Sequence, residues 1–308
     1  MSIREHRSAH RRKPGWAAPS DPGVRDRTLP DRGWNVLPAG SRAFRFPAPS
    51  GAFAAFAVGD PGHPRVVLLP GATGSKEDFV LLGPLLADAG FLVESYDLAG
   101  QYQSAAAGPV DGSPYEYGLF VADLIAFLAA GSTPVHVLGY SFAGIVAELA
   151  FADRPELFGS LVLLGVPPQS GQAFRRVRWI GALSYVLRPR QIASLIVWGI
   201  VSNLNRVPPG RLALVRLRFA FTNRRSVDEI VGLLMHVPDL SALLRHSAIP
   251  VLVAVGHHDL WSTDVHRAFA NSIGARFRVY PTGHSPCETT PHQLARDMLA
   301  LYRSAEPG

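Results

Sequence analysis

The sequence predicts an α/β fold in which a mostly parallel central sheet is covered by helices on both faces. Short apolar runs without polar alternation recur along the chain, which is typical of strands buried on both sides. Helical patterns separate these runs at a spacing that suits right-handed crossovers between parallel strands. Of the 308 residues, 47% are hydrophobic and 18% are charged, so the chain can bury the core that such a fold needs.

The expected elements follow one another in a regular order. Two extended runs, 43–47 and 52–58, predict an antiparallel pair of strands at the start of the fold. Buried strands are then expected at 66–69, 92–96, 135–138, 161–164, 251–255 and 277–280. Helical patterns occur at 76–87, 115–130, 142–153, 263–272 and 292–302.

One connection between strands is unusually long. Residues 167–247 separate two expected strands, and a connection of this length needs structure of its own. Because prolines divide it into several helix-like segments, we expect a helical cap inserted over the carboxyl ends of the strands. Residues 41–166 and 248–308 then form the core. Residues 1–40 are rich in Pro, Gly, Arg and Asp without periodicity, so we expect them to be a mobile basic tail.

The positive charge is concentrated in one internal block. The formal net charge is +6, but residues 157–227 alone contain eleven arginines and no acidic residue. Such a distribution is not that of a uniformly basic nucleic-acid binder, and no nucleic-acid partner is expected. Two interpretations stay open. The block can be a solvated helical surface, or, because residues such as Trp179 and Trp198 are interleaved with the arginines, it can contact an anionic membrane surface or an anionic substrate.

Several classes of protein are excluded or disfavoured. The single cysteine, Cys287, excludes an internal disulfide framework and a thiolate cluster for a metal. A spanning helix would need about 18 uninterrupted apolar residues, and a secretory signal would need an apolar segment behind the basic start. Neither is present, so we expect a cytoplasmic protein, with membrane association left open. No phosphate loop or H-E-x-x-H motif occurs, so no cofactor or metal is expected.

The strongest chemical signal is a serine between a strand and a helix. Residues 135–150 read V-H-V-L-G-Y-S-F-A-G-I-V-A-E-L-A, so an apolar run ends at Gly139 and a helix begins directly after Ser141. Small residues around such a serine permit a sharp turn that exposes its hydroxyl group. The next backbone N–H, that of Phe142, then faces an incoming carbonyl. Ser141 is therefore the predicted nucleophile.

A serine nucleophile needs a base, and the base needs an acid that orients it. His284 lies in the loop P-T-G-H-S-P after the last expected strand, and Asp259 lies just past the strand before it. The chain order Ser141, Asp259, His284 is that of triads built on sheets of this kind. Each residue also has an ordinary explanation, such as a helix cap or a loop histidine. Their agreement in order and context favours a catalytic triad.

The remaining candidates have secondary roles. The segment 68–79 turns at Gly71, and the backbone N–H of Ala72 is the expected second oxyanion donor beside Phe142. His257 and His258 are interpreted as loop or pocket-lining residues. Cys287 is interpreted as an inert thiol.

Five ordered motifs, spread over residues 43–303, resemble those of the α/β-hydrolase superfamily. P-G-A-T-G-S resembles the oxyanion loop H-G-x-x-G-S, Y-D-L-A-G-Q-Y-Q-S resembles D-x-x-G-x-G-x-S, and G-Y-S-F-A-G resembles the nucleophile elbow. The segments around Asp259 and His284 resemble its acid and histidine segments. Pro70 and residues 101–103 depart from the pattern, and both departures concern the mouth of the pocket.

The resemblance implies a serine hydrolase with a cap. We expect a small-molecule substrate, an ester or thioester with a hydrophobic acyl group, and whether it is anionic stays open. Three alternatives stay open: acyl transfer by the same triad, hydrolysis of a carbon–carbon bond, and a non-catalytic ligand-binding protein on a hydrolase scaffold. The sequence does not predict an oligomeric state.

Overall fold

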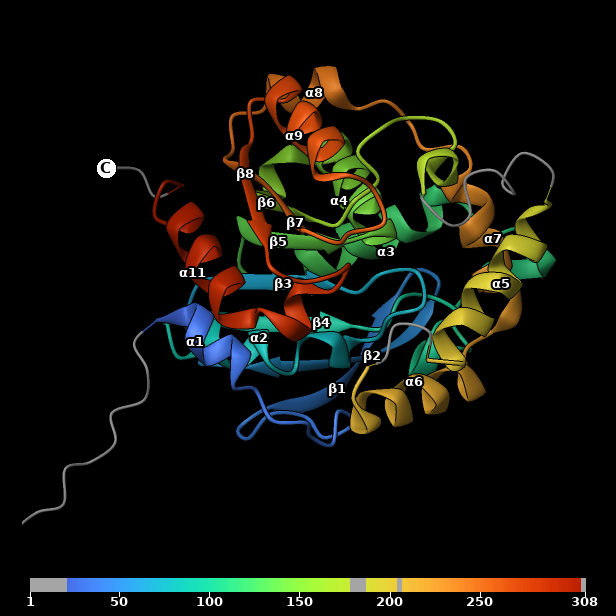
Figure 1. Ribbon diagram of the computed structural model, residues 1–308, viewed down its shortest axis with the longest axis horizontal. Helices are drawn as coiled ribbons and strands as arrows, with labels where there is room; N and C mark the ends of the chain where they lie inside the picture. The colour runs from blue at the N-terminus through green and yellow to red at the C-terminus, as the bar shows by residue number, and fades with distance from the viewer. Residues whose placement is uncertain (1–20, 178–186, 204–206, 306–308) are drawn as a thin grey trace, which may run out of the picture.

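The computed structural model describes residues 21–177, 187–203 and 207–305, which build an eight-stranded sheet with helices on both faces (Figure 1). The strand order is β1-β2-β4-β3-β5-β6-β7-β8. β2 runs antiparallel to both of its neighbours, β1 and β4, and the six strands from β4 to β8 in this order are parallel to one another. The strands are β1 (Arg42–Ala48), β2 (Gly51–Val58), β3 (Arg65–Leu69), β4 (Leu92–Tyr96), β5 (Val135–Tyr140), β6 (Phe158–Leu164), β7 (Val251–Gly256) and β8 (Arg276–Tyr280). The predicted fold class is confirmed.

Two layers of helices enclose the sheet. The layer with α3, α4 and α9 shares one hydrophobic core with it, and the layer with α2 and α11 shares another. The helices are α1 (Pro22–Arg27), α2 (Leu82–Ala87), α3 (Tyr117–Ala129), α4 (Phe142–Asp153), α5 (Pro189–Val201), α6 (Pro209–Phe221), α7 (Arg224–Leu234), α8 (Ser241–Arg245), α9 (Thr263–Ser272), α10 (Pro286–Thr289) and α11 (Pro291–Tyr302). Short 3-10 helices are η1 (Lys76–Phe79), η2 (Tyr102–Ser104), η3 (Val110–Gly112), η4 (Pro155–Leu157) and η5 (Ala173–Arg176).

The lack of polar alternation in the strands has a direct structural reason. In β3, Val67 and Leu69 belong to the core on the α3 side, while Val66 and Leu68 belong to the core on the α2 side. All four side chains are fully buried. Because successive side chains of a strand point to opposite faces, a strand covered on both faces must be apolar throughout.

The helix expected at 76–87 is two shorter elements, η1 and α2. Pro84 explains the break. Proline has no backbone N–H and is tolerated only in the first turn of a helix, so α2 has to begin only a few residues before it. The first element, η1, instead turns the charged side chains of Lys76, Glu77 and Asp78 into the interior.

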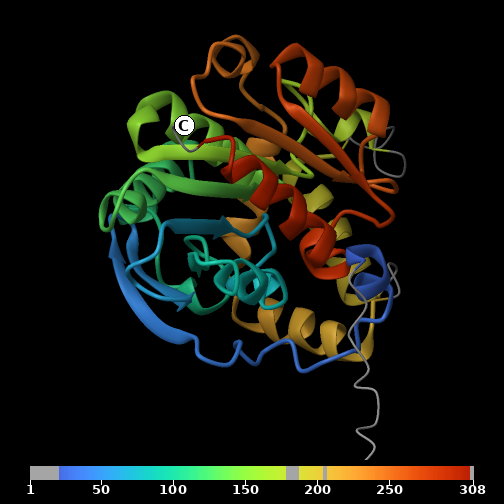
Figure 2. The same cartoon turned by 90° about the vertical axis from the view of Figure 1, so that its left-hand side faces the viewer.

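The expectation of a mobile tail over residues 1–40 is wrong for its second half. Residues 21–40 include α1, which packs against α11 as both views show (Figure 2). The Asp26 carboxylate accepts hydrogen bonds from the backbone N–H groups of His292 and Gln293, at 2.9 and 3.1 Å. These are N–H groups of the first turn of α11, so Asp26 caps that helix from the other end of the chain. Residues 1–20 lie outside the described residues.

The insertion, residues 167–247, contributes η5 and the helices α5 to α8 and lies against loops at the carboxyl ends of the strands. The backbone N–H of Tyr102 donates to Thr222 Oγ1 at 2.9 Å, and that of Tyr115 donates to Glu229 Oε2 at 2.7 Å. None of the helices within the described ranges combines the length and the apolar character that a bilayer crossing requires. Of the two tryptophans interleaved with the arginines of this segment, Trp179 lies outside the described residues.

Candidate active site

Ser141 stands on a strained turn between β5 and α4. Its backbone has φ 53° and ψ −119°, a conformation that non-glycine residues rarely adopt. The turn is possible because the neighbouring residues are small: a Cβ on Gly139 would lie 2.5 Å from the Cα of Gly144. The Ser141 N–H donates to Leu164 O of β6 at 2.8 Å, which holds the turn against the sheet.

The structure brings together the three side chains that the sequence singled out. The Nε2 atom of His284 lies 3.2 Å from Ser141 Oγ, and its Nδ1 atom lies 2.8 Å from Asp259 Oδ1. Each residue follows a different parallel strand: Ser141 follows β5, Asp259 follows β7 and His284 follows β8. The three groups thus form a continuous hydrogen-bonded chain.

The environment of Asp259 keeps its carboxylate ionised. The side chain is buried, which alone would raise its pKa, but the neighbouring His284 and the hydrogen bond between them outweigh burial, so the pKa is lowered. The backbone N–H of Leu260 also donates to Asp259 Oδ1 at 2.6 Å. An ionised carboxylate at this point fixes the proton of His284 on Nδ1 and leaves Nε2 free to accept a proton from Ser141.

Gly165, directly after β6, leaves room for this pair. It has φ 56°, and a Cβ there would lie 3.0 Å from Cε1 of the His284 ring and 3.2 Å from Asp259 Oδ2. The loop therefore passes close behind the imidazole, where a larger residue would press on it.

Ala72 and Phe142, whose backbone N–H groups are the predicted oxyanion donors, belong to segments beside Ser141. The loop carrying Ala72 runs beside the serine, since a Cβ on Gly71 would lie 3.3 Å from Ser141 Cβ. Phe142 is the first residue of α4. Within the described residues, the N–H groups of Ala72 and Phe142 have no hydrogen-bond acceptor. Both are therefore available to a ligand.

Trp261 and His266 also lie near His284, and sequence reasoning missed them. The Trp261 ring centroid is 6.1 Å from that of His284 and 6.1 Å from that of His266. His266 is fully buried, and burial lowers its pKa to about 4, so its ring is neutral at pH 7. One signal was available in the sequence. His266 and Ala270 are four residues apart in an expected helix, and this spacing places both on its inner face.

The rival residues take no part in this chain of hydrogen bonds. His257 and His258 are exposed, and their rings contact one another at 4.8 Å. Cys287 is fully buried, and burial raises the pKa of its thiol well above the ordinary value. Within the described ranges, no three His, Cys, Asp or Glu side chains are grouped so that they could hold a metal ion.

A cavity of about 220 Å³ is lined by Trp261, whose ring lies 6.1 Å from that of His284, but not by Ser141, Asp259 or His284 themselves. Its lining is uncharged and comes from Trp261 and from the segment 167–173, which continues the chain after Gly165. A larger cavity of about 380 Å³ is lined by Arg65 and Leu92, among others. These residues begin β3 and β4, so that cavity lies at the amino ends of the strands, away from Ser141.

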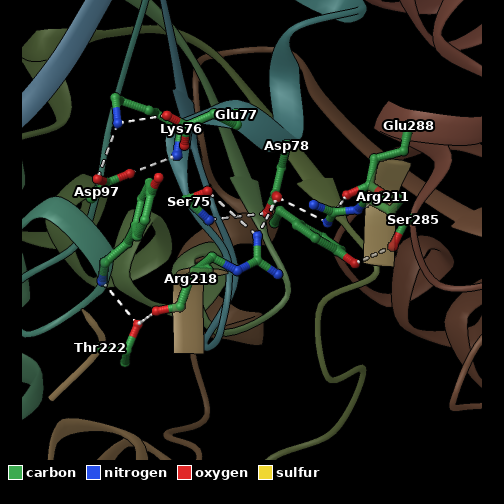
Figure 3. Close-up of polar contacts among 12 residues, drawn as sticks. Ser75, Lys76, Glu77, Asp78, Asp97, Arg211, Arg218, Thr222, Ser285 and Glu288 are labelled. Atoms are coloured by element: carbon green, nitrogen blue, oxygen red, sulfur yellow. Dashed lines mark hydrogen bonds and ion pairs between the residues drawn. The ribbon is translucent and has the colours of Figure 1, made fainter. Parts of the chain in front are cut away.

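A buried cluster of charges joins α6 of the insertion to the loops of the site (Figure 3). Arg211 Nη2 lies 3.0 Å and Arg218 Nη1 lies 2.7 Å from Asp78 Oδ1. Arg211 also bonds to both carboxylate oxygens of Glu288 in α10. Asp78 lies six residues after Ala72, and Glu288 lies four residues after His284. A single guanidinium group therefore connects both loops.

Lys76 and Asp97 extend the cluster at 3.2 Å from one another. Burial raises the pKa of Asp97 to about 7, partly offset by the charge of Lys76. The positive charges of Arg211 and Arg218 in the insertion are therefore paired with the carboxylates of Asp78 and Glu288 in the core.

Comparisons with known proteins give the family and the fold of the chain. A family model described as "Alpha/beta hydrolase family" matches residues 66–297. The human "Serine hydrolase-like protein" is 31% identical over 134 residues, which are 43% of this chain and 64% of that protein. A second human relative, "Serine hydrolase-like protein 2", is 31% identical over the same length, and the match spans 42% of it.

Solved structures share the fold. A hydrolase from Pseudomonas aeruginosa PA01 has a TM-score of 0.68 at 23% identity, covering 85% of this chain and 98% of its own. A thermophilic esterase from Thermogutta terrifontis has a TM-score of 0.66 at 19% identity, covering 86% and 100%. A thioesterase domain from the curacin biosynthetic pathway has a TM-score of 0.64 at 16% identity, covering 84% and 99%. From the family match over most of its length, this chain belongs to the alpha/beta hydrolase family.

Proposed function

We propose that the protein is a serine hydrolase that cleaves an ester or thioester bond of a substrate with a hydrophobic acyl group. The observation that carries the proposal is the hydrogen-bonded chain from Ser141 through His284 to Asp259, at 3.2 and 2.8 Å, on a serine with φ 53°. A binding protein has no need of this strained serine, since backbone strain persists where function requires it. The esterase and thioesterase structures named above support the same reaction class by fold alone.

The geometry suits acyl transfer through a covalent intermediate. His284 Nε2 removes the proton of Ser141 as Oγ attacks the acyl carbonyl, and Asp259 stabilises the imidazolium that forms. The N–H groups of Ala72 and Phe142 bind the oxyanion. His284 then gives the proton to the leaving alcohol or thiol. In the second half of the reaction, His284 activates a water molecule, which hydrolyses the acyl-enzyme.

The surroundings of the site favour an uncharged substrate group. The cavity beside Trp261 has no charged residue in its lining. Arg211 and Arg218, the buried arginines of α6, are bonded to Asp78 and Glu288. We therefore propose a neutral acyl ester or thioester rather than an anion bound through these arginines.

The test is labelling with a fluorophosphonate probe, followed by assays on p-nitrophenyl esters of increasing chain length. Ser141→Ala is expected to abolish labelling and to lower kcat by several orders of magnitude, because the nucleophile is lost. Its melting temperature should stay close to that of the parent protein. Full esterase activity in Ser141→Ala would refute the proposal.

Product analysis distinguishes the other reactions of the same three residues. With a competing alcohol or amine present, a hydrolase releases mainly the free acid, whereas an acyltransferase releases mainly the new ester or amide. A diketone that is cleaved faster than any ester would indicate carbon–carbon bond hydrolysis instead. A parent protein that neither labels nor turns over any of these substrates would indicate a ligand-binding role.

A further inference from the structure

Large apolar side chains are exposed together on the outer face of α5 and α6. Trp198 and Phe221 are each 60% exposed, and Leu195 and Leu217 are also exposed. Leu195 and Trp198 are three residues apart on α5, while Leu217 and Phe221 are four apart on α6, so each pair lies on one side of its helix. Single exposed apolar residues need no explanation, but a group on neighbouring helices does.

The exposed side chains of these two neighbouring helices are here called the α5–α6 face. The two helices pack against each other on the side of the molecule opposite α11 (Figure 1). Two arginines bond to α5 from neighbouring helices. Arg216 Nη2 of α6 lies 3.4 Å from Val201 O at the end of α5, and Arg224 Nη2 of α7 donates to Ser194 Oγ at 2.7 Å. The α5–α6 face thus combines apolar side chains with guanidinium groups.

The α5–α6 face carries an excess of positive charge. Exposed arginines lie on α5 and α6 and at the start of α7, and the carboxylates that pair with them are Asp228 and Glu229 of α7. Asp228 is shared between two arginines and Glu229 pairs with a third. Within the described residues, Arg188 and Arg216 have no carboxylate partner. The exposed arginines of this region are Arg188, Arg190, Arg216, Arg224 and Arg225.

We propose that the α5–α6 face docks on an anionic membrane surface. Trp198 and Phe221 would enter the boundary between headgroups and acyl chains, where aromatic side chains are favoured, while the arginines bind lipid phosphates. A second copy of this chain fits less well, because a face-to-face pair would bring arginines against arginines. The proposal concerns binding and does not depend on the reaction at Ser141, so the Ser141→Ala variant should dock equally well.

Vesicle flotation of the full-length protein tests the proposal. We expect binding to vesicles of phosphatidylcholine mixed with phosphatidylglycerol, little binding to phosphatidylcholine alone, and release as the salt concentration is raised. The double variant Trp198→Ser/Phe221→Ser should weaken binding about tenfold or more, since its apolar anchors are lost. The double variant Arg188→Gln/Arg216→Gln should bind both vesicle types alike.

The matched control is Val279→Ser, which removes an exposed apolar residue of the edge strand β8, outside the α5–α6 face. It should bind like the parent protein, and circular dichroism should show that all variants are folded. The proposal is overturned if the parent protein fails to bind anionic vesicles at low salt. It is also overturned if the Trp198→Ser/Phe221→Ser variant binds them unchanged, or if that variant only converts a dimer to a monomer in size-exclusion chromatography.

Discussion

At the scale of single residues, Gly165 tests how precisely His284 must be placed, because the backbone at Gly165 passes close to the imidazole ring. Gly165 and Gly274 both have positive φ, of 56° and 68°, but only Gly165 has the site as its neighbour. Gly165→Ala should lower kcat about tenfold to a hundredfold, because the new Cβ displaces His284 from Ser141. Gly274→Ala carries the same backbone strain, of about 1 kcal/mol, with no heavy atom within 4 Å of its Cβ.

Both glycine variants should lose similar stability in urea unfolding, and only Gly165→Ala should lose esterase activity. Equal activity of the two variants would mean that the ring tolerates the added methyl group. Both variants introduce backbone strain at a positive φ, but only Gly165→Ala adds a methyl group beside the His284 ring. A difference in activity between the two variants therefore reports on the position of the imidazole.

The buried carboxyl group of Glu148 in α4 should make the free energy of unfolding depend on pH. Burial raises its pKa to about 8, so the folded protein holds a proton that the unfolded chain releases above its ordinary pKa of 4.5. The free energy of unfolding should therefore fall as pH rises from about 4.5 to 8, by up to about 1.4 kcal/mol for each pH unit from this group. Glu148→Gln, which is neutral throughout, should remove this part of the slope.

Urea denaturation at pH 5 and pH 8 measures the difference. The matched control is Glu156→Gln at an exposed position, for which the fall between pH 5 and pH 8 should persist. A slope unchanged by Glu148→Gln would place the responsible proton on another buried carboxyl group, such as Asp123, whose pKa burial raises to about 6.

At the scale of elements, the link between α6 and the core rests on Arg211. Arg211→Gln leaves Glu288 buried without its guanidinium partner and leaves Asp78 paired with Arg218 alone. Breaking a buried ion pair costs about 3 to 5 kcal/mol. Arg216→Gln on the exposed side of the same helix should change stability by no more than about 0.5 kcal/mol. Thermal unfolding of the two variants provides the measurement, and equal melting temperatures would contradict the assigned role.

The sequence predicted most elements because their signals are local. The apolar runs located all eight strands, and the helix at 142–153 begins and ends where α4 does. The split at 76–87 was missed because the apolar pattern continues through it, while Pro84 limits where α2 can begin. A single helix was predicted because the apolar pattern was given more weight than the effect of Pro84.

The site residues could be predicted for a similar reason. Ser141, Asp259 and His284 each follow a strand, and parallel strands bring their carboxyl ends together at one edge of the sheet. The ion pair of Arg211 with Glu288 could not be predicted, because the two residues are 77 positions apart and their pairing depends on how the insertion packs. The eleven arginines were visible as a block, but which of them are buried was not.

At the scale of the whole molecule, α1 closes the structure by capping α11. Asp26→Ala removes the acceptor of the His292 and Gln293 N–H groups and should lower the free energy of unfolding by about 2 kcal/mol. Asp60→Ala, in an exposed turn where Asp60 accepts from Gly62, is the control and should have little effect. Urea unfolding of the two variants tests this, and equal midpoints would show that the cap contributes nothing.

The segment around α1 also shows why composition misled. Residues 21–40 carry no periodic pattern, since a helix of six residues is too short to show one. Trp34 is nevertheless buried, and it packs with Val80 and Leu214 of distant segments. This segment is ordered by contacts with residues that are far away in the sequence, and such contacts cannot be predicted from the local sequence pattern.

The buried bonds of α6 limit how the enzyme can be engineered. Exchanging the insertion for that of a relative is a common way to change substrate choice, but here Asp78 and Glu288 belong to the core and Arg211 and Arg218 to the insertion. A chimaera that lacks the two guanidinium groups would leave the carboxylates of Asp78 and Glu288 buried without a positively charged partner. A successful graft therefore has to carry both arginines or replace both acids with neutral residues.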